Sequence, residues 1–382
     1  MQASPKTVVI APDSFKESRS AAQVASAIAR GIHSVYPDVA CIERPIADGG
    51  EGTVDTILSC IPGERVSLTV HDALMRPITA EYGLIDDGTT AVIEVAAASG
   101  LSLVSPDDRN ALVTTSYGTG ELIRDALDRG AQRCIIGLGG SATNDAGAGI
   151  ASALGIRLLD EQHEDISPGG LELVRVAAID RSEAHPGLAK TTIALACDVN
   201  IPMHGPQGSM LNYSAQKGAT PDQEDALEKS LVHFGGLLNE HAGYAVSELP
   251  GAGAAGAMGA GLVALCGGSL KPGFELLSNL VGLEEVVAEC DLVITGEGRI
   301  DAQTEHGKAP MGVAKIARRY GKPVVAFCGT VAYDMAFKTE FFKEVITIDS
   351  IASDHNDAIK RADHYLAELA ESFARRWSAV LD

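Results

Sequence analysis

The sequence has few aromatic residues and a deficit of positive charge. Aromatic residues make up 4% of the 382 residues, and there is a single Trp. Lys and Arg number 30 against 51 Asp and Glu, which gives a formal net charge of -21. Such a surface repels nucleic acids and anionic membranes, so we expect neither as a partner. We interpret the acidity as a contribution to solubility.

The sequence also lacks paired cysteine motifs, long apolar runs and a common nucleotide motif. Its seven cysteines are scattered and none forms a C-x-x-C pair, which argues against a zinc site and favours a reducing compartment. No window contains 18 strongly apolar residues, and no basic segment with a long apolar run precedes Thr7, so we expect a cytoplasmic protein. The Walker pattern G-x-x-x-x-G-K-[ST] is absent.

What the sequence has is length, 41 glycines and an alternation of strand and helix patterns. A chain of 382 residues exceeds the comfortable size of one core, so two domains are expected. Residues 8–12 form a short apolar run that ends in turn residues. The helix predicted next has an apolar face that includes Val24, Ile28 and Ile32, and a second strand is predicted over residues 39–46. This order predicts a parallel sheet covered by helices.

The pattern of apolar and polar residues changes twice along the chain. After about residue 65, short alternating segments separated by turns predict antiparallel strands. After about residue 290, buried strands and amphipathic helices return. We therefore expect an α/β protein of two dissimilar domains. Residues 1–65 and 290–382 would form a Rossmann- or flavodoxin-like parallel-sheet domain, and residues 66–289 an inserted α/β domain with a mixed sheet.

Polar residues follow the first two predicted strands. Asp13, Ser14 and Lys16 come after the first strand, where ligands bind in open α/β sheets, although a helix cap with a solvated lysine is an equal alternative. The second strand leads into ADGGEGT, in which Asp48 and Glu51 are oxygen donors suited to Mg²⁺. The paired glycines of this segment, Gly49 and Gly50, let backbone amides approach an anion; an ordinary β-turn is the alternative.

The most distinctive stretch is GLGGSATNDAGAG, residues 137–149. It follows a strand expected at 133–138 and precedes a helix expected near 146–155, so its amides would form an anion site at a helix N-terminus. Ser141 and Thr143 can add hydroxyl hydrogen bonds, but no lysine is present, so a cation has to come from elsewhere. The alternative is that Asn144 or Asp145 is an ordinary N-cap, which leaves the glycines unexplained.

Three further features come from the middle of the chain. Asp198 ends a strand expected at 191–196 and is a weak candidate for a general base or metal ligand, and Lys217 supplies a cation downstream. GAGAAG, residues 251–256, matches the G-x-G-x-x-G pattern, but the preceding segment is a poor strand and ends in a proline. A loop facing phosphate or adenine is favoured over a nicotinamide site, with packing of a Gly/Ala-rich helix as the alternative.

The last feature follows a buried strand near residue 295. Glu297, Arg299 and Asp301 lie after this strand, and Lys308 precedes the next helix. Phosphoryl transfer uses carboxylates to hold Mg²⁺ and cations to neutralise developing negative charge. Because this loop is expected at the same sheet edge as Asp13, we favour a functional role over a solvated, salt-bridged loop.

Taken in order, these motifs resemble the type 1 glycerate kinases. The matching segments are APDSFKES, PIADGGEGT, GLGGSATND, ACDV, QKGATP, PGAGAAG and TGEGRIDAQTEHGKAP, which span the chain from about residue 7 to 330. The resemblance implies a kinase that uses ATP and Mg²⁺ to phosphorylate D-glycerate, with 2-phosphoglycerate as the main product, in glyoxylate, glycolate or sugar-acid breakdown. It also implies two dissimilar α/β domains. We expect a monomer or a homodimer.

Physical reasoning assigns roles within this framework. The loop over residues 139–145 would hold part of the triphosphate, and the glycine loop over residues 251–256 would contribute. The residues expected to bind the nucleotide are Gly139, Gly140, Ser141, Thr143, Asn144, Asp145, Gly253 and Gly256. Those expected to hold Mg²⁺ are Asp48, Glu51 and Glu297. Those expected to bind substrate are Ser14, Lys16, Asp48, Gly49, Gly50, Lys217, Arg299 and Lys308. The catalytic candidates are Asp198, Asp301, Arg299 and Lys16, with one of the two aspartates orienting the attacking hydroxyl.

Three alanines are among the positions where the sequence departs from the family pattern. The family commonly has GGSATNDGG, FGPQKGA and GAAGG, where this chain has Ala146, Ala215 and Ala257 in place of Gly, Pro and Gly, and Tyr213 and Ser214 in place of Phe and Gly. These changes affect ligand fit rather than chemistry. The alternatives to the proposed reaction are formation of 3-phosphoglycerate, a nicotinamide-dependent hydroxy-acid oxidoreductase that rests on GAGAAG alone, and a non-catalytic sensor of a carboxylate metabolite.

Overall fold

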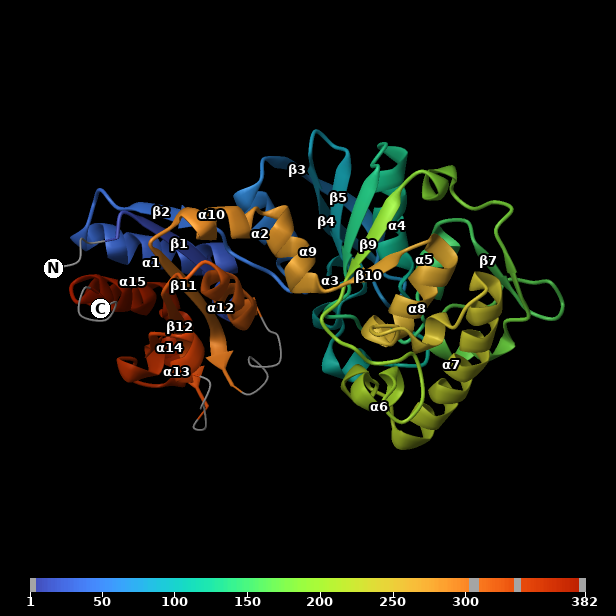
Figure 1. The fold of residues 1–382 in the computed structure, drawn as a ribbon. Helices are drawn as coiled ribbons and strands as arrows, with labels where there is room; N and C mark the ends of the chain where they lie inside the picture. The colour runs from blue at the N-terminus through green and yellow to red at the C-terminus, as the bar shows by residue number, and fades with distance from the viewer. Residues whose placement is uncertain (1–4, 302–308, 333–337, 378–382) are drawn as a thin grey trace. The chain divides into compact units, whose positions relative to one another are not determined.

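The computed structural model describes residues 5–301, 309–332 and 338–377. Its contacts divide the chain into two compact units (Figure 1). Unit 1 comprises Met1–Asp48, Asp55–Ile61 and Phe274–Asp382, and unit 2 comprises Gly49–Val54 and Pro62–Gly273. The boundary expected at residue 290 thus falls at Phe274, and the short segment Gly49–Val54 belongs to unit 2 although the chain on either side of it belongs to unit 1.

Unit 1 contains a five-stranded parallel sheet. Its strands are β1 (Thr7–Pro12), β2 (Ala40–Glu43), β11 (Leu292–Ile300), β12 (Val324–Val331) and β13 (Glu344–Thr347). They lie in the order β13-β12-β11-β1-β2, and every pair is parallel. Numbered within the unit, this order is 2-1-3-4-5, which is that of a flavodoxin-like doubly wound sheet. The predicted fold class of this part of the chain is confirmed.

The core of unit 1 forms where α1 and α15 pack on the sheet. The helices of this unit are α1 (Ala21–Val35), α2 (Thr53–Cys60, whose first two residues are counted in unit 2), α9 (Gly273–Leu280, whose first residue is counted in unit 2), α10 (Leu283–Glu289), α12 (Ala309–Arg319), α13 (Lys338–Phe341), α14 (His355–Lys360) and α15 (Ala362–Ala374). The apolar stripe of α1 predicted from its 3.6-residue period is fully buried at Val24, Ile28 and Ile32. Gly31 allows close contact, because a Cβ there would lie 2.2 Å from the carbonyl oxygen of Ala367.

Unit 2 contains a six-stranded mixed sheet in the order β10-β9-β6-β5-β4-β3. Its strands are β3 (Gly63–His71), β4 (Pro77–Ile85), β5 (Thr90–Glu94), β6 (Arg133–Gly137), β9 (Thr192–Ala196) and β10 (Ser269–Lys271). The first three form an antiparallel meander, and β5, β6, β9 and β10 are parallel. The mixed sheet expected for the inserted region is therefore present. A two-stranded sheet pairs β7 (Arg157–Leu159) with β8 (Ala178–Asp180).

The helices of unit 2 bury a second core. They are α3 (Val95–Ser99), α4 (Tyr117–Asp128), α5 (Ala148–Ala153), α6 (Ser209–Tyr213), α7 (Pro221–Ala242) and α8 (Ala254–Cys266). Two expectations are corrected. The helix expected near 146–155 has only six residues. The apolar residues at 359, 362, 366, 369, 373 and 377 have the spacing of one helical face and predict a single last helix, but the structure divides it into α14 and α15 at Arg361.

Candidate functional site

The carboxyl ends of β1 and β11 open onto a pocket within unit 1. In a doubly wound sheet, ligands bind where the strand order reverses, which here lies between these two strands. The pocket has a volume of about 450 Å³. The predicted residues that line it are Asp13, Ser14, Lys16, Asp48, Glu297 and Arg299. The structure therefore brings together residues from three separate loops that the sequence analysis had linked only by position.

The inner wall of this pocket is acidic. The amide of Asp13 donates to the carbonyl of Gly296 at 2.8 Å, and this bond draws the end of β1 to β11. Burial, and then the negative charges of Asp48 and Glu297, raise the pKa of the Asp13 carboxyl to about 7. Carboxylates that repel one another in this way are stabilised by a cation. Within the described residues, no three His, Cys, Asp or Glu side chains are arranged to bind one metal ion.

The expected metal ligands do not all lie in this pocket. Asp48 and Glu297 line it, whereas Glu51 belongs to unit 2 and is exposed there. Magnesium is commonly bound through one or two carboxylates together with substrate phosphates and water. Two carboxylates in the pocket therefore fit Mg²⁺ carried by a nucleotide better than a cage built from protein side chains alone.

The cationic residues of the pocket lie toward its solvent side. Lys16 is exposed, and Arg299 is 65% exposed, with its Nε 3.4 Å from Oδ2 of Asp301. The ion pair agrees in part with the salt-bridged alternative, and it links two of the predicted catalytic residues to each other. Lys308, the remaining cation predicted for this region, lies outside the described residues.

Sequence reasoning missed several residues of the pocket. Thr330 lies near the end of β12, and Asp349 and His355 follow β13. Asp349 could have been found, because it comes two residues after β13, at the carboxyl end of a parallel strand. His355 had no comparable signal, since it begins the short helix α14 and does not follow a strand directly.

In unit 2, a buried carboxylate holds the glycine segment that follows Asp48. Oε2 of Glu94 accepts a hydrogen bond from the amide of Gly52 at 3.1 Å, and Oε1 accepts one from the amide of Val54 at 2.6 Å. Glu94 ends β5 and is 7% exposed. These amides thus bind a carboxylate of the chain itself, and this contact explains why Gly49–Val54 belongs to unit 2. The sequence analysis did not single out Glu94.

Several glycines of these two loops are explained by backbone packing. A Cβ on Gly137 would lie 2.3 Å from the carbonyl oxygen of Gly49, and one on Gly139 would lie 2.6 Å from Cα of Gly50. The amide of Gly139 also donates to the carbonyl of Gly49 at 3.1 Å. Only glycine allows two backbones to approach this closely. The glycines of both motifs therefore serve, at least at these positions, to fit one loop against the other.

Only one edge of the 139–145 loop reaches solvent. Gly140 is exposed, Gly139 is partly exposed and Ser141 is 6% exposed. Thr143, Asn144 and Asp145 are completely buried. These last three were predicted to bind nucleotide, but in the structure their side chains lie inside unit 2. A ligand would meet the loop through residues 139–141.

Asp145 organises the interior of this loop. Its Oδ2 accepts hydrogen bonds from the amide of Ser116 at 2.7 Å, the hydroxyl of Ser116 at 2.8 Å and the amide of Gly149 at 3.1 Å. Its carboxylate therefore occupies the start of the short helix α5, where an anion had been expected. Gly147 rather than Asp145 is the N-cap residue of α5, so the expected N-cap role is not confirmed, although Asp145 accepts a hydrogen bond from the amide of Gly149 in the first turn of the helix. Ser116 is the N-cap residue of α4, but its side chain makes no capping hydrogen bond and instead donates to Asp145.

Two other predicted glycines are also buried against backbone. A Cβ on Gly253 would lie 2.1 Å from the carbonyl oxygen of Pro202, and one on Gly256 would lie 1.9 Å from that of Thr143. The segment is preceded by the 3₁₀ turn Val246–Glu248 rather than a strand, and residues 255–257 have left-handed backbone angles. This geometry is not that of a dinucleotide-binding loop.

The remaining predicted residues of unit 2 differ in exposure. Asp198 is exposed at the end of β9, where its Oδ1 accepts a hydrogen bond from the amide of Gly273 at 2.7 Å. Lys217 is 2% exposed, so its ammonium group lies in the interior rather than on a surface that meets substrate.

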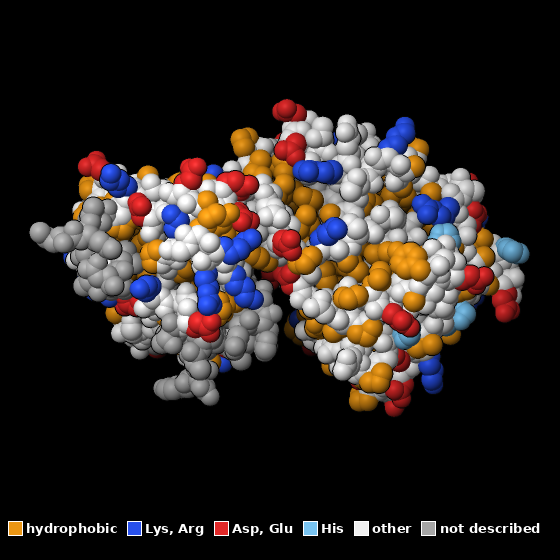
Figure 2. Space-filling view, in the orientation of Figure 1, with side chains coloured by type: hydrophobic (Ala, Val, Ile, Leu, Met, Phe, Trp, Pro, Cys, Tyr) orange, Lys and Arg blue, Asp and Glu red, His pale blue; other side chains and the backbone are white. Residues whose placement is uncertain are grey.

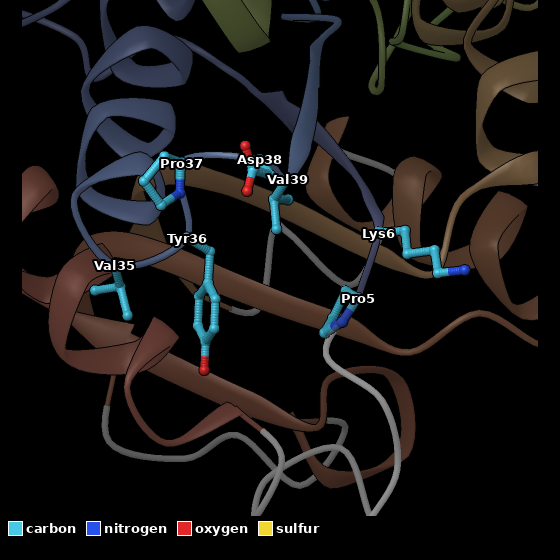
Figure 3. Close-up of a pocket in the computed structure, with 7 residues that line it drawn as sticks. All are labelled: Pro5, Lys6, Val35, Tyr36, Pro37, Asp38 and Val39. Carbon is cyan, nitrogen blue, oxygen red and sulfur yellow. The ribbon is translucent and has the colours of Figure 1, made fainter.

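A second cavity of about 400 Å³ lies at the surface of unit 1, near Tyr36 (Figure 3). Among the described residues that line it, Asp38 and Lys6 carry the charged side chains, and the Lys6 amine points away from the other labelled residues (Figure 3). It lacks the grouped carboxylates of the pocket beside β1, which remains the stronger candidate site.

Comparison with known proteins decides the family. A family model described as the glycerate kinase family matches residues 8–378. The chain is 45% identical over 370 residues to a glycerate kinase of Halalkalibacterium halodurans, covering 96% of this chain and 97% of that one. The chain belongs to the glycerate kinase family.

Two further relatives agree with this family. A glycerate 2-kinase of Escherichia coli K12 is 46% identical over 328 residues, covering 86% of each chain. The crystal structure of a candidate glycerate kinase 2 from Salmonella typhimurium LT2 is 44% identical, with a TM-score of 0.87 and 98% of each chain covered. As a member of the glycerate kinase family, the chain is an enzyme, a phosphotransferase with an alcohol as acceptor, and ATP is the phosphoryl donor that a kinase family implies.

Two of the three alanines that depart from the family pattern fall at unusual backbone positions. Ala146 has φ 50° and Ala257 has φ 70°, both in the left-handed region that favours glycine. The two loops are joined by a hydrogen bond from the amide of Ala146 to the carbonyl of Gly256 at 3.0 Å. The alanines are therefore accommodated with strain in a pair of packed loops. Ala215 is exposed and begins a 3₁₀ turn, where it causes no such strain.

On the face that Figure 2 shows, acidic and basic side chains are interspersed, with apolar side chains between them. In the described residues, no helix combines the length and the apolar character needed to cross a membrane.

Proposed function

We propose that the protein transfers the γ-phosphoryl group of ATP to D-glycerate in a Mg²⁺-dependent reaction, with 2-phosphoglycerate as the product. Its relatives carry the names glycerate kinase and glycerate 2-kinase at 45–46% identity. The observation that carries the proposal is the pocket at the switch point of unit 1, where acidic residues and exposed cations lie together. Its volume of about 450 Å³ lies in the range of small-molecule ligand sites.

The acidic wall would hold the divalent cation. Asp48 and Glu297 are the carboxylates in the pocket that would bind Mg²⁺, while Asp13 adds negative charge beside them. Bound Mg²⁺ would neutralise phosphate charge and lower the barrier to attack on phosphorus. Without a cation, this wall would repel both ATP and glycerate. Glu51 stays a proposed ligand whose position in unit 2 does not by itself support the assignment.

The exposed cations would bind the anionic substrates. Lys16 and Arg299 lie where they can contact the glycerate carboxylate or the moving phosphoryl group, with Ser14 as a hydrogen-bonding partner. Asp198 or Asp301 would orient the attacking hydroxyl. The Arg299 Nε lies 3.4 Å from Oδ2 of Asp301, so the catalytic cation and this candidate aspartate would act side by side. Holding the reactants in place supplies most of the rate gain in such reactions.

In unit 2, the accessible edge of the 139–145 loop would bind part of the triphosphate. The seven free cysteines are consistent with action in the reducing cytoplasm. The nicotinamide alternative loses its support, because GAGAAG does not follow a strand. Formation of 3-phosphoglycerate remains the second candidate, since the family includes relatives named glycerate kinase without a position.

A direct assay tests the proposal. Purified protein is incubated with ATP, D-glycerate and Mg²⁺, and the product is identified by ³¹P NMR, with EDTA in a parallel reaction. We expect 2-phosphoglycerate with Mg²⁺ and none with EDTA. A 3-phosphoglycerate signal would establish the second candidate, and absence of either product would refute the proposed substrate.

A further inference from the structure

The side chain of Lys217 reaches the interior face of the 139–145 loop from a distant part of the sequence. It ends the 3₁₀ turn Ala215–Lys217 and is 2% exposed. Its Nζ donates hydrogen bonds to Oγ of Ser141 at 2.9 Å and to the carbonyl oxygen of Thr143 at 2.6 Å. The Lys217 ammonium group therefore links Ser141 and Thr143 in a loop that has no lysine of its own.

Burial of the Lys217 ammonium group has a free-energy cost that its hydrogen bonds have to offset. An ammonium group removed from water needs hydrogen bonds and a counter-charge. Lys217 forms no ion pair within 4.0 Å in the part of the chain that the structure describes, and the nearest acidic influence on it is Asp145. Burial, opposed by the charge of Asp145, lowers the pKa of the Lys217 ammonium to about 7. Both the charged and the neutral form of the amine can donate the two observed hydrogen bonds.

The loop also has backbone donors that a ligand can use. In the described structure, the amides of Gly140 and Ser141 donate to no protein acceptor, while the carbonyl of Gly140 accepts from the amide of Leu101 at 2.8 Å. Below this edge, Oγ1 of Thr143 is fully buried and has no partner in the described residues. The loop thus has two amides free to bind an anion at its accessible edge and an unsatisfied hydroxyl beside the carbonyl that Lys217 holds.

We propose that Lys217 is a positioning residue for phosphate binding, which fixes the 139–145 loop from within so that the amides of Gly140 and Ser141 can hold a phosphoryl oxygen of the nucleotide. The inference rests on the proposed function, because it takes the anion to be the nucleotide phosphate. It replaces the expectation that Lys217 touches the substrate, which its burial does not allow. Lys217 would thereby provide the lysine that the 139–145 loop lacks in its own sequence.

The test compares Lys217→Met with a matched control, Lys229→Met. Lys229 is an exposed lysine on α7, in the same unit. Steady-state kinetics with ATP and D-glycerate varied in turn give kcat and both KM values, and circular dichroism gives the melting temperature. Hydrogen exchange of the amides of residues 139–145 is measured on the same proteins without substrates.

We expect Lys217→Met to raise the KM for ATP by about tenfold or more, because buried hydrogen bonds to a charged group are lost. The KM for glycerate and kcat should change much less, and amide exchange at residues 139–145 should be faster. Lys229→Met should match the wild type. Lys217→Gln, which keeps a donor without charge, should give an intermediate KM for ATP and provides the measurement if Lys217→Met does not fold.

Two outcomes overturn the proposal. One is a KM for ATP within twofold of the wild-type value in folded Lys217→Met or Lys217→Gln. The other is an equal rise in both KM values with unchanged exchange of the loop amides, as expected from a general structural defect. If the wild type forms no phosphoglycerate, the proposed function has failed, and the exchange measurement still decides whether Lys217 fixes the loop.

Discussion

The two units place their polar groups in opposite ways. In unit 1, Asp48 and Arg299 stand on the wall of a pocket beyond parallel strands, and Glu297 lies beside them. In unit 2, Glu94, Asp145 and Lys217 are buried and bind backbone groups or hydroxyls of neighbouring loops. The first set is arranged to meet charged ligands and the second to hold loops in shape. Residues of the same types therefore have different roles in the two units. Their burial and their hydrogen-bond partners distinguish these roles.

The largest expected effect tests the unit 1 side of this comparison. Asp48→Asn and Glu297→Gln should each lower kcat by about a hundredfold or more, because they remove a charge that would hold Mg²⁺ in the transition state. Neither should lower the melting temperature, since each relieves repulsion of Asp13. Activity assays at saturating Mg²⁺ and thermal unfolding provide the check. Asp38→Asn, an exposed carboxylate of the same unit, is the control.

A lower melting temperature of Asp48→Asn and Glu297→Gln without a fall in kcat would contradict this distinction between the two units. It would mean that the carboxylates of unit 1 hold structure, as those of unit 2 do.

The next effect tests the unit 2 side. Asp145→Asn should reduce the free energy of unfolding by about 2–4 kcal/mol, because a buried carboxylate that accepts from Ser116 and Gly149 becomes a neutral amide with two donors of its own. Urea unfolding of the variant measures the loss, and Asp107→Asn, exposed in the same unit, serves as control. Wild-type stability with impaired ATP binding would instead place Asp145 in the ligand site.

A smaller effect is expected in the pH dependence of stability. Folding lowers the pKa of Lys217 from 10.5 to about 7, so between these values the unfolded chain holds a proton that the folded chain lacks. The free energy of unfolding should therefore rise with pH in this window, by at most about 1.4 kcal/mol per pH unit. Urea unfolding of the wild type and Lys217→Met at pH 7 and pH 9 gives the difference. Parallel pH slopes in the two proteins would contradict the buried, titrating lysine.

The smallest effect concerns the strained alanines of unit 2. Ala146→Gly and Ala257→Gly should each stabilise the protein by about 0.5–1 kcal/mol, because relief of the left-handed strain exceeds the added entropy of the unfolded chain. Ala226→Gly within the helix α7 should instead destabilise it by about 1 kcal/mol. Chemical unfolding separates these signs. Destabilisation by all three substitutions would show that the alanine methyl groups at 146 and 257 contribute more by packing than they cost in strain.

The sequence predicted the fold class well because unit 1 is built from local signals. The apolar runs of β1 and β11, the 3.6-residue stripe of α1 and the polar residues after each strand all agree with one parallel sheet. The residues after β1 and β11 could be joined into one candidate site because the carboxyl ends of parallel strands share an edge. Residues that depend on less regular elements, such as His355 at the start of α14, were not found.

The interior of unit 2 could not be predicted in the same way. Glu94 binds Gly52 and Val54 across 42 and 40 residues of sequence, and Lys217 binds Ser141 across 76. The periodicity of apolar residues does not indicate contacts between residues so far apart in the sequence. A glycine that fits a close backbone contact, as Gly137 does against Gly49, has the same appearance in a sequence as a glycine that admits a phosphate. The burial of Thr143, Asn144 and Asp145 could therefore be seen only in the structure.

The most direct test of the account is Mn²⁺ binding, measured by electron paramagnetic resonance in the presence of ATP. Mn²⁺ substitutes for Mg²⁺ at oxygen ligands. We predict that the wild type binds the Mn²⁺–ATP complex and that the double variant Asp48→Asn/Glu297→Gln binds it at least about tenfold more weakly, while Asp38→Asn binds it as the wild type does. Equal affinity in the wild type and the double variant would contradict the claim that the unit 1 pocket is the cation-binding site.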